Sequence, residues 1–367
     1  MKPVRETWID YARGIAIILV LYRHVFEGIK NAGIAVERYL FIEHFNIMFF
    51  SFRMPLFFIV SGIFVESSLK KRGLTGFLST KVKTILYPFF LWGILQITLQ
   101  LILSKYVNSN RTIYSYLDLL YAPRAIDQFW YLYALFNVSV LYAVGVAVFK
   151  LKPVVNILIG AVLYFISTAA HQSNLGLGFL GDILHYYIFY SIGDFFCNAI
   201  RKKENQQYFE SWKLLGLLFV PFFATQYYFL KQNLLHPYTG YEYVEYYQPI
   251  LFIAIALLGC MFVLALSFFL QKLKAIPWLH VLGSHSLYIY VSHVIVLAAV
   301  RIFITKVLGI YNVPLLLILG IGLGLLIPVL FYKAACQFNM RWLFSLEPSG
   351  KKHKDPTILE REQSISR

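Results

Sequence analysis

Long apolar runs separated by short polar segments dominate the chain, and they are the first guide to its fold. The least interrupted runs cover 14–22, 49–64, 214–225, 250–270 and 315–332. A helix that spans a bilayer needs about 20 mostly apolar residues. Barrel strands alternate polar with apolar positions, which these runs do not do. Because only helices and closed barrels satisfy their backbone in lipid, the pattern predicts an all-α, polytopic transmembrane helix bundle.

Ten helices account for this pattern. We expect them at 9–26, 45–65, 84–104, 128–149, 153–171, 182–199, 213–230, 248–270, 284–304 and 314–336. An even number of spans places both ends of the chain on one side of the membrane. The connecting segments expected on that side, which carry many of the Lys and Arg residues, are 66–83, 150–152, 200–212 and 271–283. By the positive-inside rule, both termini are predicted to be cytoplasmic.

Composition agrees with a membrane protein and excludes a soluble enzyme. Hydrophobic residues make up 59% and charged residues 14% of the 367 positions, whereas a soluble domain averages about 25% charged residues. The net charge of +15 therefore reflects the excess of Lys and Arg in the loops on one side of the membrane, and we expect no nucleic-acid partner. The three cysteines show no CxxC spacing, so no metal site is expected. We expect a membrane domain over 1–340 and a polar, disordered cytoplasmic tail over 341–367.

The first expected span holds the densest set of ionisable residues, which are costly in a membrane and therefore functional candidates. Asp10 and Arg13 are three residues apart and can pair. Arg13 and His24 lie within about 20° of one helix face and roughly 16 Å apart along the axis. Glu27, one turn beyond His24, can orient its imidazole. Plainer alternatives stay open: an interfacial helix start for Asp10 and Arg13, and an interface histidine.

Arg53 lies deep in the second expected span, two residues before Pro55. Proline leaves a backbone carbonyl without its helical partner, so an arginine here suits an anion or a carbonyl oxygen. The alternative is an internal salt bridge to Glu43 or Asp182.

Two further places carry candidate chemistry. Lys81 and Lys83 stand in the inner segment before the third span, where basic residues suit phosphate groups but also fit ordinary inside charge. Trp130 opens the fourth span, and His293 lies in the middle of the ninth, where an imidazole needs a partner. Core packing is the alternative for His293.

Four segments together resemble the acyltransferase-3 family of integral membrane acyltransferases, which acylate bacterial cell-surface carbohydrates. They are Trp8 to Gly14 running on to His24, Phe52 to Phe58 with Ser61 and Gly62, Phe129 to Leu132, and Leu282 to Tyr290 running on to His293. The resemblance extends from about residue 7 to residue 336. It implies about ten helices, an acyl-CoA donor used from the cytoplasm, an essential His24 and a functional Arg13.

The chain departs from the family pattern at one place. Where the family usually has arginines before the third helix, this sequence has Lys81 and Lys83. Lysines keep the charge but lose the bidentate fork that suits phosphate.

The resulting hypothesis is a multi-pass O-acyltransferase of the bacterial cytoplasmic (inner) membrane. It transfers an acetyl or other short acyl group from acetyl-CoA or another acyl-CoA, used as donor and not as a bound cofactor, to an exopolysaccharide, a lipopolysaccharide or a lipid-linked glycan. His24 acts as general base or transient acyl carrier. Arg53 stabilises the oxyanion, and Arg13 pairs with Asp10.

The remaining candidates bind substrates. Arg13, Lys81 and Lys83 hold the CoA phosphates, and Glu27, Trp130 and His293 belong to the acceptor site. The rival hypothesis is a transporter or flippase for a glycan or lipid-linked sugar, because buried charges and helix breaks also mark transport paths. The halves show no repeat symmetry, which weighs against it. A scaffold protein explains neither His24 nor Arg53.

Overall fold

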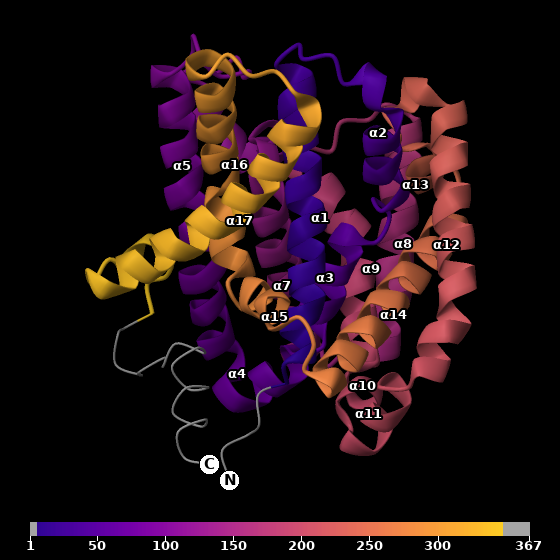
Figure 1. The fold of residues 1–367 in the computed structure, drawn as a ribbon. Coiled ribbons are helices and arrows are strands. Elements are labelled where there is room, and N and C mark those ends of the chain that lie inside the picture. The colour runs from indigo at the N-terminus through magenta and orange to yellow at the C-terminus, as the bar shows by residue number, and fades with distance from the viewer. Residues whose placement is uncertain (1–5, 348–367) are drawn as a thin grey trace, which may run out of the picture.

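The computed structural model describes residues 6–347, which form helices and connecting turns without a strand (Figure 1). The long helices are α1 (Trp8–Asn31), α4 (Val65–Lys81), α5 (Tyr87–Ile102), α7 (Trp130–Ala147), α8 (Pro153–Gln172), α9 (Phe179–Phe195), α12 (Trp212–Leu235), α14 (Pro249–Leu273), α16 (Ser286–Ile302) and α17 (Val313–Gln337). The shorter helices are α2 (Leu40–Met48), α3 (Arg53–Gly62), α6 (Ser115–Tyr121), α10 (Cys197–Arg201), α11 (Lys203–Phe209), α13 (Tyr243–Tyr247) and α15 (Pro277–Ser284).

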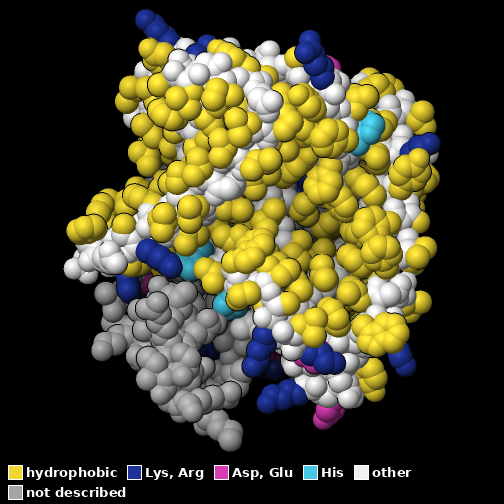
Figure 2. Space-filling view, in the orientation of Figure 1, with side chains coloured by type: hydrophobic (Ala, Val, Ile, Leu, Met, Phe, Trp, Pro, Cys, Tyr) yellow, Lys and Arg dark blue, Asp and Glu magenta, His cyan; other side chains and the backbone are white. Residues whose placement is uncertain are grey.

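The all-α membrane bundle is confirmed. Eight helical stretches among the described residues are long and apolar enough to cross a membrane. Each of the ten expected spans coincides with helix, including α1 with its several charges and the 17-residue α9. Hydrophobic side chains cover most of the visible face, with Lys and Arg mainly toward its two ends (Figure 2). This distribution is what a lipid-facing surface requires.

Helix α1 runs through the middle of the bundle and contacts α3, α14, α15, α16 and α17 (Figure 1). Its contact with α15 is backbone against backbone. A Cβ at Gly283 would lie 1.6 Å from the Asp10 carbonyl oxygen, and one at Gly14 would lie 2.3 Å from the Leu279 carbonyl oxygen. Glycine at both positions therefore sets how closely the two helices approach.

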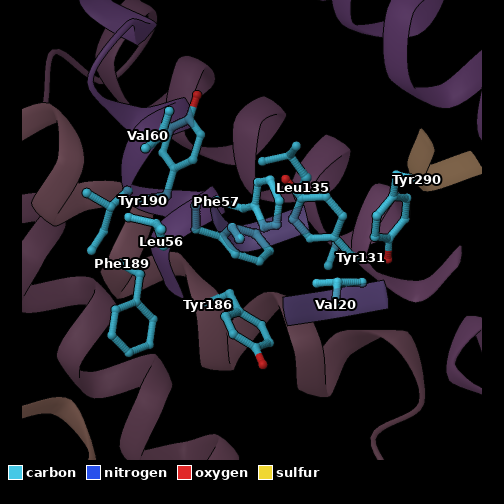
Figure 3. Packing of buried hydrophobic residues seen from close by; sticks show 14 of the residues in the cluster. Val20, Leu56, Phe57, Val60, Tyr131, Leu135, Tyr186, Phe189, Tyr190 and Tyr290 are labelled. Atoms are coloured by element: carbon cyan, nitrogen blue, oxygen red, sulfur yellow. The ribbon is translucent and has the colours of Figure 1, made fainter. Parts of the chain in front are cut away.

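Aromatic side chains fill the core where α1, α3, α7, α9 and α16 meet (Figure 3). Tyr131 of α7 lies between Phe57 of α3 and Tyr290 of α16, with ring centroids 5.5 Å and 5.2 Å away. Tyr186 of α9 stacks on Phe58 at 4.6 Å. This layer holds α16 and α1 in fixed relation, and both helices carry candidate site residues.

The second expected span, 45–65, is not one continuous helix. Helix α2 ends at Met48 and α3 begins at Arg53. Pro55 has no N–H to donate back into the preceding turn, and the Arg53 side chain bonds the carbonyls left open at the end of α2. The backbone carbonyls exposed at the break are therefore hydrogen-bonded within the protein.

The expected inner loop 66–83 is also different, because it is helical. Helix α4 is kinked at Gly73, which has a φ of +65°, and passes through a π-helical turn at Val82–Leu86 into α5. The segment contains no proline before Pro88, which stands in the first turn of α5 and is tolerated there. Lys81 and Lys83 consequently lie on helical backbone rather than in a loop.

The first residues of the expected tail pack onto the bundle. Arg341–Leu343 form a 3₁₀ turn, Phe344 is only 2% exposed, and Trp92 Nε1 donates to the Leu343 carbonyl at 2.7 Å. The aromatic face of Phe344 meets Trp92 and Tyr332. The rest of the expected tail, 348–367, lies outside the described residues.

Candidate active site

Two histidines from different helices lie against each other. The rings of His24 on α1 and His293 on α16 have centroids 5.1 Å apart. His293 is fully buried, and its Nδ1 lies 2.7 Å and 3.1 Å from the carbonyl oxygens of Tyr290 and Ile289. Because a carbonyl only accepts, Nδ1 carries the proton and Nε2 is the acceptor nitrogen. His293 Nε2 is buried and has no hydrogen-bond partner among the described residues.

Glu27 flanks His24 from one turn further along α1. Its Oε2 lies 3.9 Å from His24 Nδ1, and its Oε1 accepts from Arg23 Nε at 2.7 Å. The Arg23 guanidinium lies 4.9 Å from the centre of the Phe50 ring. The carboxylate is thus held in place by Arg23 while it stays close to His24. This arrangement suits a group that orients an imidazole.

A cavity of about 350 Å³ opens beside His24, toward the C-terminal end of α1. Its volume is at the small end of the roughly 300–1,000 Å³ that is usual for ligand sites. The polar side chains that line it are His24, Glu27, Asn31, Gln96, Gln100, Asn108, Ser109, Asp127 and Arg301. The His24 side chain is 21% exposed, so a ligand in the cavity can reach its imidazole.

Most of this polar lining was missed by the sequence analysis. Gln96 and Gln100 both donate to Asp127 Oδ2, at 2.7 Å and 3.0 Å, and Arg111 pairs with the same oxygen at 3.0 Å. One signal was available, because Gln96 and Gln100 are four residues apart in an otherwise apolar helix and therefore share a face. Asp127 gave no such signal, because it stands at the edge of a span.

Arg53 is 3% exposed and is bonded to backbone rather than to an acid. Its Nε donates to the Phe49 carbonyl at 2.7 Å, one terminal nitrogen to the Leu19 carbonyl at 3.3 Å, and the other to Asn46 Oδ1 at 3.0 Å and to the Asn46 carbonyl. Each of its three nitrogens is therefore engaged in joining α2, α3 and α1.

The two acids considered as partners of Arg53 pair elsewhere. Glu43 Oε1 lies 2.9 Å from Lys30 Nζ, and Asp182 Oδ1 lies 2.6 Å from a terminal nitrogen of Arg124. The alternative of an internal salt bridge from Arg53 to either acid is therefore wrong. The bond to the Leu19 carbonyl places the Arg53 guanidinium beside α1. Leu19 precedes His24 by five positions.

A basic cluster lies toward the N-terminal end of α1. Arg13 and Arg72 are close enough to Lys81 to interact with it electrostatically. Lys81 Nζ lies 5.2 Å from the centre of the Phe77 ring. The backbone carbonyl of Lys83 accepts from Leu346 N at 3.2 Å. The structure thus places Arg13 within electrostatic range of Lys81, and it uses the backbone of Lys83 to anchor the end of the described chain.

The remaining predicted residues lie apart from His24. Trp130 has the Arg124 guanidinium 4.3 Å from its ring centre and Tyr186 at 5.5 Å, and it does not line the cavity. Asp10 is 5% exposed beneath α15.

One group of residues has the composition of a metal site. Glu66, Asp194 and Cys197 have their ligand atoms within 4.8 Å of one another.

The members of this acidic group are already hydrogen-bonded. Tyr142 donates to Asp194 Oδ2 at 2.6 Å, and Cys197 Sγ lies 3.7 Å from Glu66 Oε2. Because these bonds account for the proximity, we assign no metal there.

Comparison with known proteins agrees with the geometry. The acyltransferase-3 family profile, described as an acyltransferase domain, matches residues 6–333. No curated protein and no solved structure matches the chain. The match covers the whole bundle, from the first residues of α1 into α17, and it contains every candidate residue named above. The chain therefore belongs to the acyltransferase-3 family and is a membrane acyltransferase.

Proposed function

We propose that this protein transfers an acetyl or another short acyl group from acyl-CoA to a hydroxyl group of a cell-surface or exported glycan. The observation that carries the proposal is the position of His24. Its imidazole lines a cavity of about 350 Å³ and lies between the Glu27 carboxylate and the His293 ring. A histidine that a substrate can reach, flanked by a carboxylate and a second imidazole, is suited to proton transfer.

In the proposed reaction, His24 takes the proton of the acceptor hydroxyl as its oxygen attacks the carbonyl carbon of the thioester. The new C–O bond forms, the C–S bond breaks, and the leaving CoA sulfur receives the proton back from the imidazolium. While the imidazolium exists, one of its N–H groups carries the transferred proton, and the positive charge of the ring is stabilised by the Glu27 carboxylate, whose Oε2 lies 3.9 Å from Nδ1. Arg53 acts as a positioning residue that fixes the α2–α3 joint against α1.

The donor enters from the opposite end in this proposal. Arg13, Lys81 and Arg72 form the basic cluster that suits the CoA phosphates. Arg13 and His24 are separated by roughly 16 Å along α1, so the pantetheine arm bridges the distance between phosphates and thioester. The cytoplasmic face is then the end of the bundle at which α1 begins, and the membrane is the bacterial cytoplasmic membrane.

The test uses membrane vesicles, radiolabelled acetyl-CoA and a crude surface-glycan preparation. We expect label to reach the glycan with the wild-type protein and to fall by about 10²–10⁴-fold with His24→Ala, the usual contribution of a general acid–base group. His44→Ala is the matched control, because His44 on α2 does not line the cavity.

Two results would contradict the proposal. Full transfer by a folded His24→Ala variant removes His24 from the mechanism. Movement of glycan across the vesicle membrane without release of free CoA favours the transporter or flippase instead.

A further inference from the structure

One wall of the cavity is organised around Asp127, whose backbone has a φ of +48°. Aspartate visits the left-handed region more readily than most residues, but the conformation still costs of the order of 1 kcal/mol. Such strain persists only where the surroundings hold it, and it gathers at binding and catalytic sites. The conformation is therefore a reason to ask what the Asp127 side chain does.

Three side chains converge on a single oxygen of Asp127. Oδ2 accepts from Gln96 Nε2 at 2.7 Å, from Gln100 Nε2 at 3.0 Å and from Arg111 at 3.0 Å. Arg111 also donates to Gln100 Oε1 at 2.8 Å, which ties two of the donors together. The other oxygen, Oδ1, takes part in none of these bonds. Because the Asp127 side chain is 33% exposed and lines the cavity, this carboxylate keeps acceptor capacity for a ligand.

A chain of hydrogen bonds links Asp127 to the histidine pair. Gln128, which is fully buried, donates from Nε2 to Gln96 Oε1 at 2.9 Å. The Gln128 carbonyl accepts from the Tyr290 hydroxyl, and the Tyr290 carbonyl accepts from His293 Nδ1 at 2.7 Å. The carboxylate and the His293 imidazole are thus fixed in one network, and His24 packs against that imidazole, as a site that positions two parts of one ligand requires.

The rest of the cavity suits a polyhydroxyl ligand. Gln100 and Asn108 supply neutral amides, and Ser109 Oγ is buried with no hydrogen-bond partner in residues 6–347. Leu99 supplies apolar surface of the kind that packs on the C–H groups of a sugar ring. Asp127 and Glu27 are paired with Arg111 and Arg23, and Arg301 also lines the cavity, so the lining offers both donors and acceptors to the hydroxyl groups of a sugar.

We propose that Asp127 binds the acceptor. Its carboxylate accepts a hydrogen bond from a second hydroxyl of the sugar whose first hydroxyl is deprotonated by His24. Gln96, Gln100 and Arg111 are positioning residues that hold the Asp127 carboxylate in place. The inference rests on the proposed function and adds to it the residue that selects the acceptor.

The experiment measures both Michaelis constants of Asp127→Asn in the vesicle assay, with the surface-glycan preparation and acetyl-CoA each varied in turn. Asparagine also tolerates the left-handed conformation, so the backbone is kept. Loss of a hydrogen bond to a charged group is expected to raise the KM for glycan about tenfold or more. The KM for acetyl-CoA is expected to change by less than about twofold, because the carboxylate does not contact the donor.

Two matched variants sharpen the result. Asp118→Asn removes a carboxylate from α6 in the same connecting region without touching the cavity, and it is expected to leave both constants unchanged. Gln100→Leu removes one support of Asp127 and is expected to raise the KM for glycan by a smaller factor than Asp127→Asn.

The outcomes distinguish a failure of this inference from a failure of the proposed function. Normal transfer by the wild type, with the same KM for glycan in Asp127→Asn, overturns the role of Asp127 alone. A parallel rise in the KM for glycan and the KM for acetyl-CoA also overturns it, because a general structural effect of the substitution would then explain both changes. No transfer of label by the wild type overturns the proposed function, and the inference with it.

Discussion

His24 and His293 meet across the contact between α1 and α16, and the acceptor nitrogen of His293 is determined by its backbone contacts. Its Nδ1 is committed to the carbonyls of Tyr290 and Ile289, which leaves Nε2 as the acceptor nitrogen of a ring whose centroid lies 5.1 Å from that of His24. The imidazolium that forms on His24 therefore lies against a neutral imidazole carried by a helix far away in sequence. Catalysis then depends on the packing of α16 against α1.

Replacing His293 should lower turnover more than donor binding. We expect His293→Phe, which keeps a ring but removes its nitrogens, to lower kcat by about 10- to 100-fold, because the protonated His24 would then lie beside an apolar ring instead of a polar one. His293→Gln retains an acceptor oxygen and should recover part of the activity. Steady-state rates at varied acetyl-CoA check this, and equal activity of the two variants would contradict it.

Replacing Arg53 should destabilise the protein. Arg53→Leu leaves the carbonyls of Phe49, Leu19 and Asn46 without their donor, at about 1–3 kcal/mol for each group left unsatisfied. Arg53→Lys has one donor centre and cannot reach all three. We expect both to lower the apparent Tm in detergent. An Arg53→Leu protein with the Tm of the wild type and no activity would instead support a direct role on the oxyanion.

Alanine at position 283 should force α15 away from α1. The added Cβ would meet the Asp10 carbonyl oxygen at 1.6 Å, and backbone cannot move aside as a flexible side chain can. Overpacking of this kind costs about 1–3 kcal/mol or more. Gly216→Ala in α12 is the control, because its Cβ meets nothing within 4 Å, and helix propensity makes it neutral or slightly stabilising. Apparent Tm values of both variants decide the point; equal values would refute close backbone packing.

Stability should depend on pH through Glu242, in the connection between α12 and α14. Burial, and then the neighbouring Glu245 carboxylate, raise the pKa of Glu242 from 4.5 to about 7. The unfolded chain therefore loses this proton first as the pH rises, so stability declines between about pH 4.5 and about pH 7. Apparent Tm should fall less over this range in Glu242→Gln than in the wild type, and parallel curves would contradict the shift.

The fold was predictable to the level of its spans because lipid removes most alternatives. Apolar runs of sufficient length can only be helices there, and each expected span coincides with one. The predictions that were wrong concern the local backbone structure of two segments. The break before Arg53 depends on side-chain bonds to carbonyls of α2 and α1, and the 66–83 segment is helical on both sides of a kink at Gly73. Neither follows from hydropathy.

The site was predictable only where polar residues stand inside apolar helices. His24, Glu27 and His293 met that condition, and the structure brings them together. Asp127 did not, because its importance arises from three donors that lie between 16 and 31 residues away in the chain. Trp130 belongs to the Phe129 to Leu132 segment that resembles the family, but it lies beside Arg124 rather than in the cavity.

The bond from Arg53 to the Leu19 carbonyl has a consequence for biogenesis. A guanidinium in an isolated span would meet lipid during insertion, at a cost of at least several kcal/mol. Its acceptors on α2 are available within the same broken span, but the acceptor on α1 is not. We therefore expect α1 to stay next to α2 and α3 as they leave the insertion machinery, so that these elements enter the bilayer as one cooperative unit rather than one span at a time.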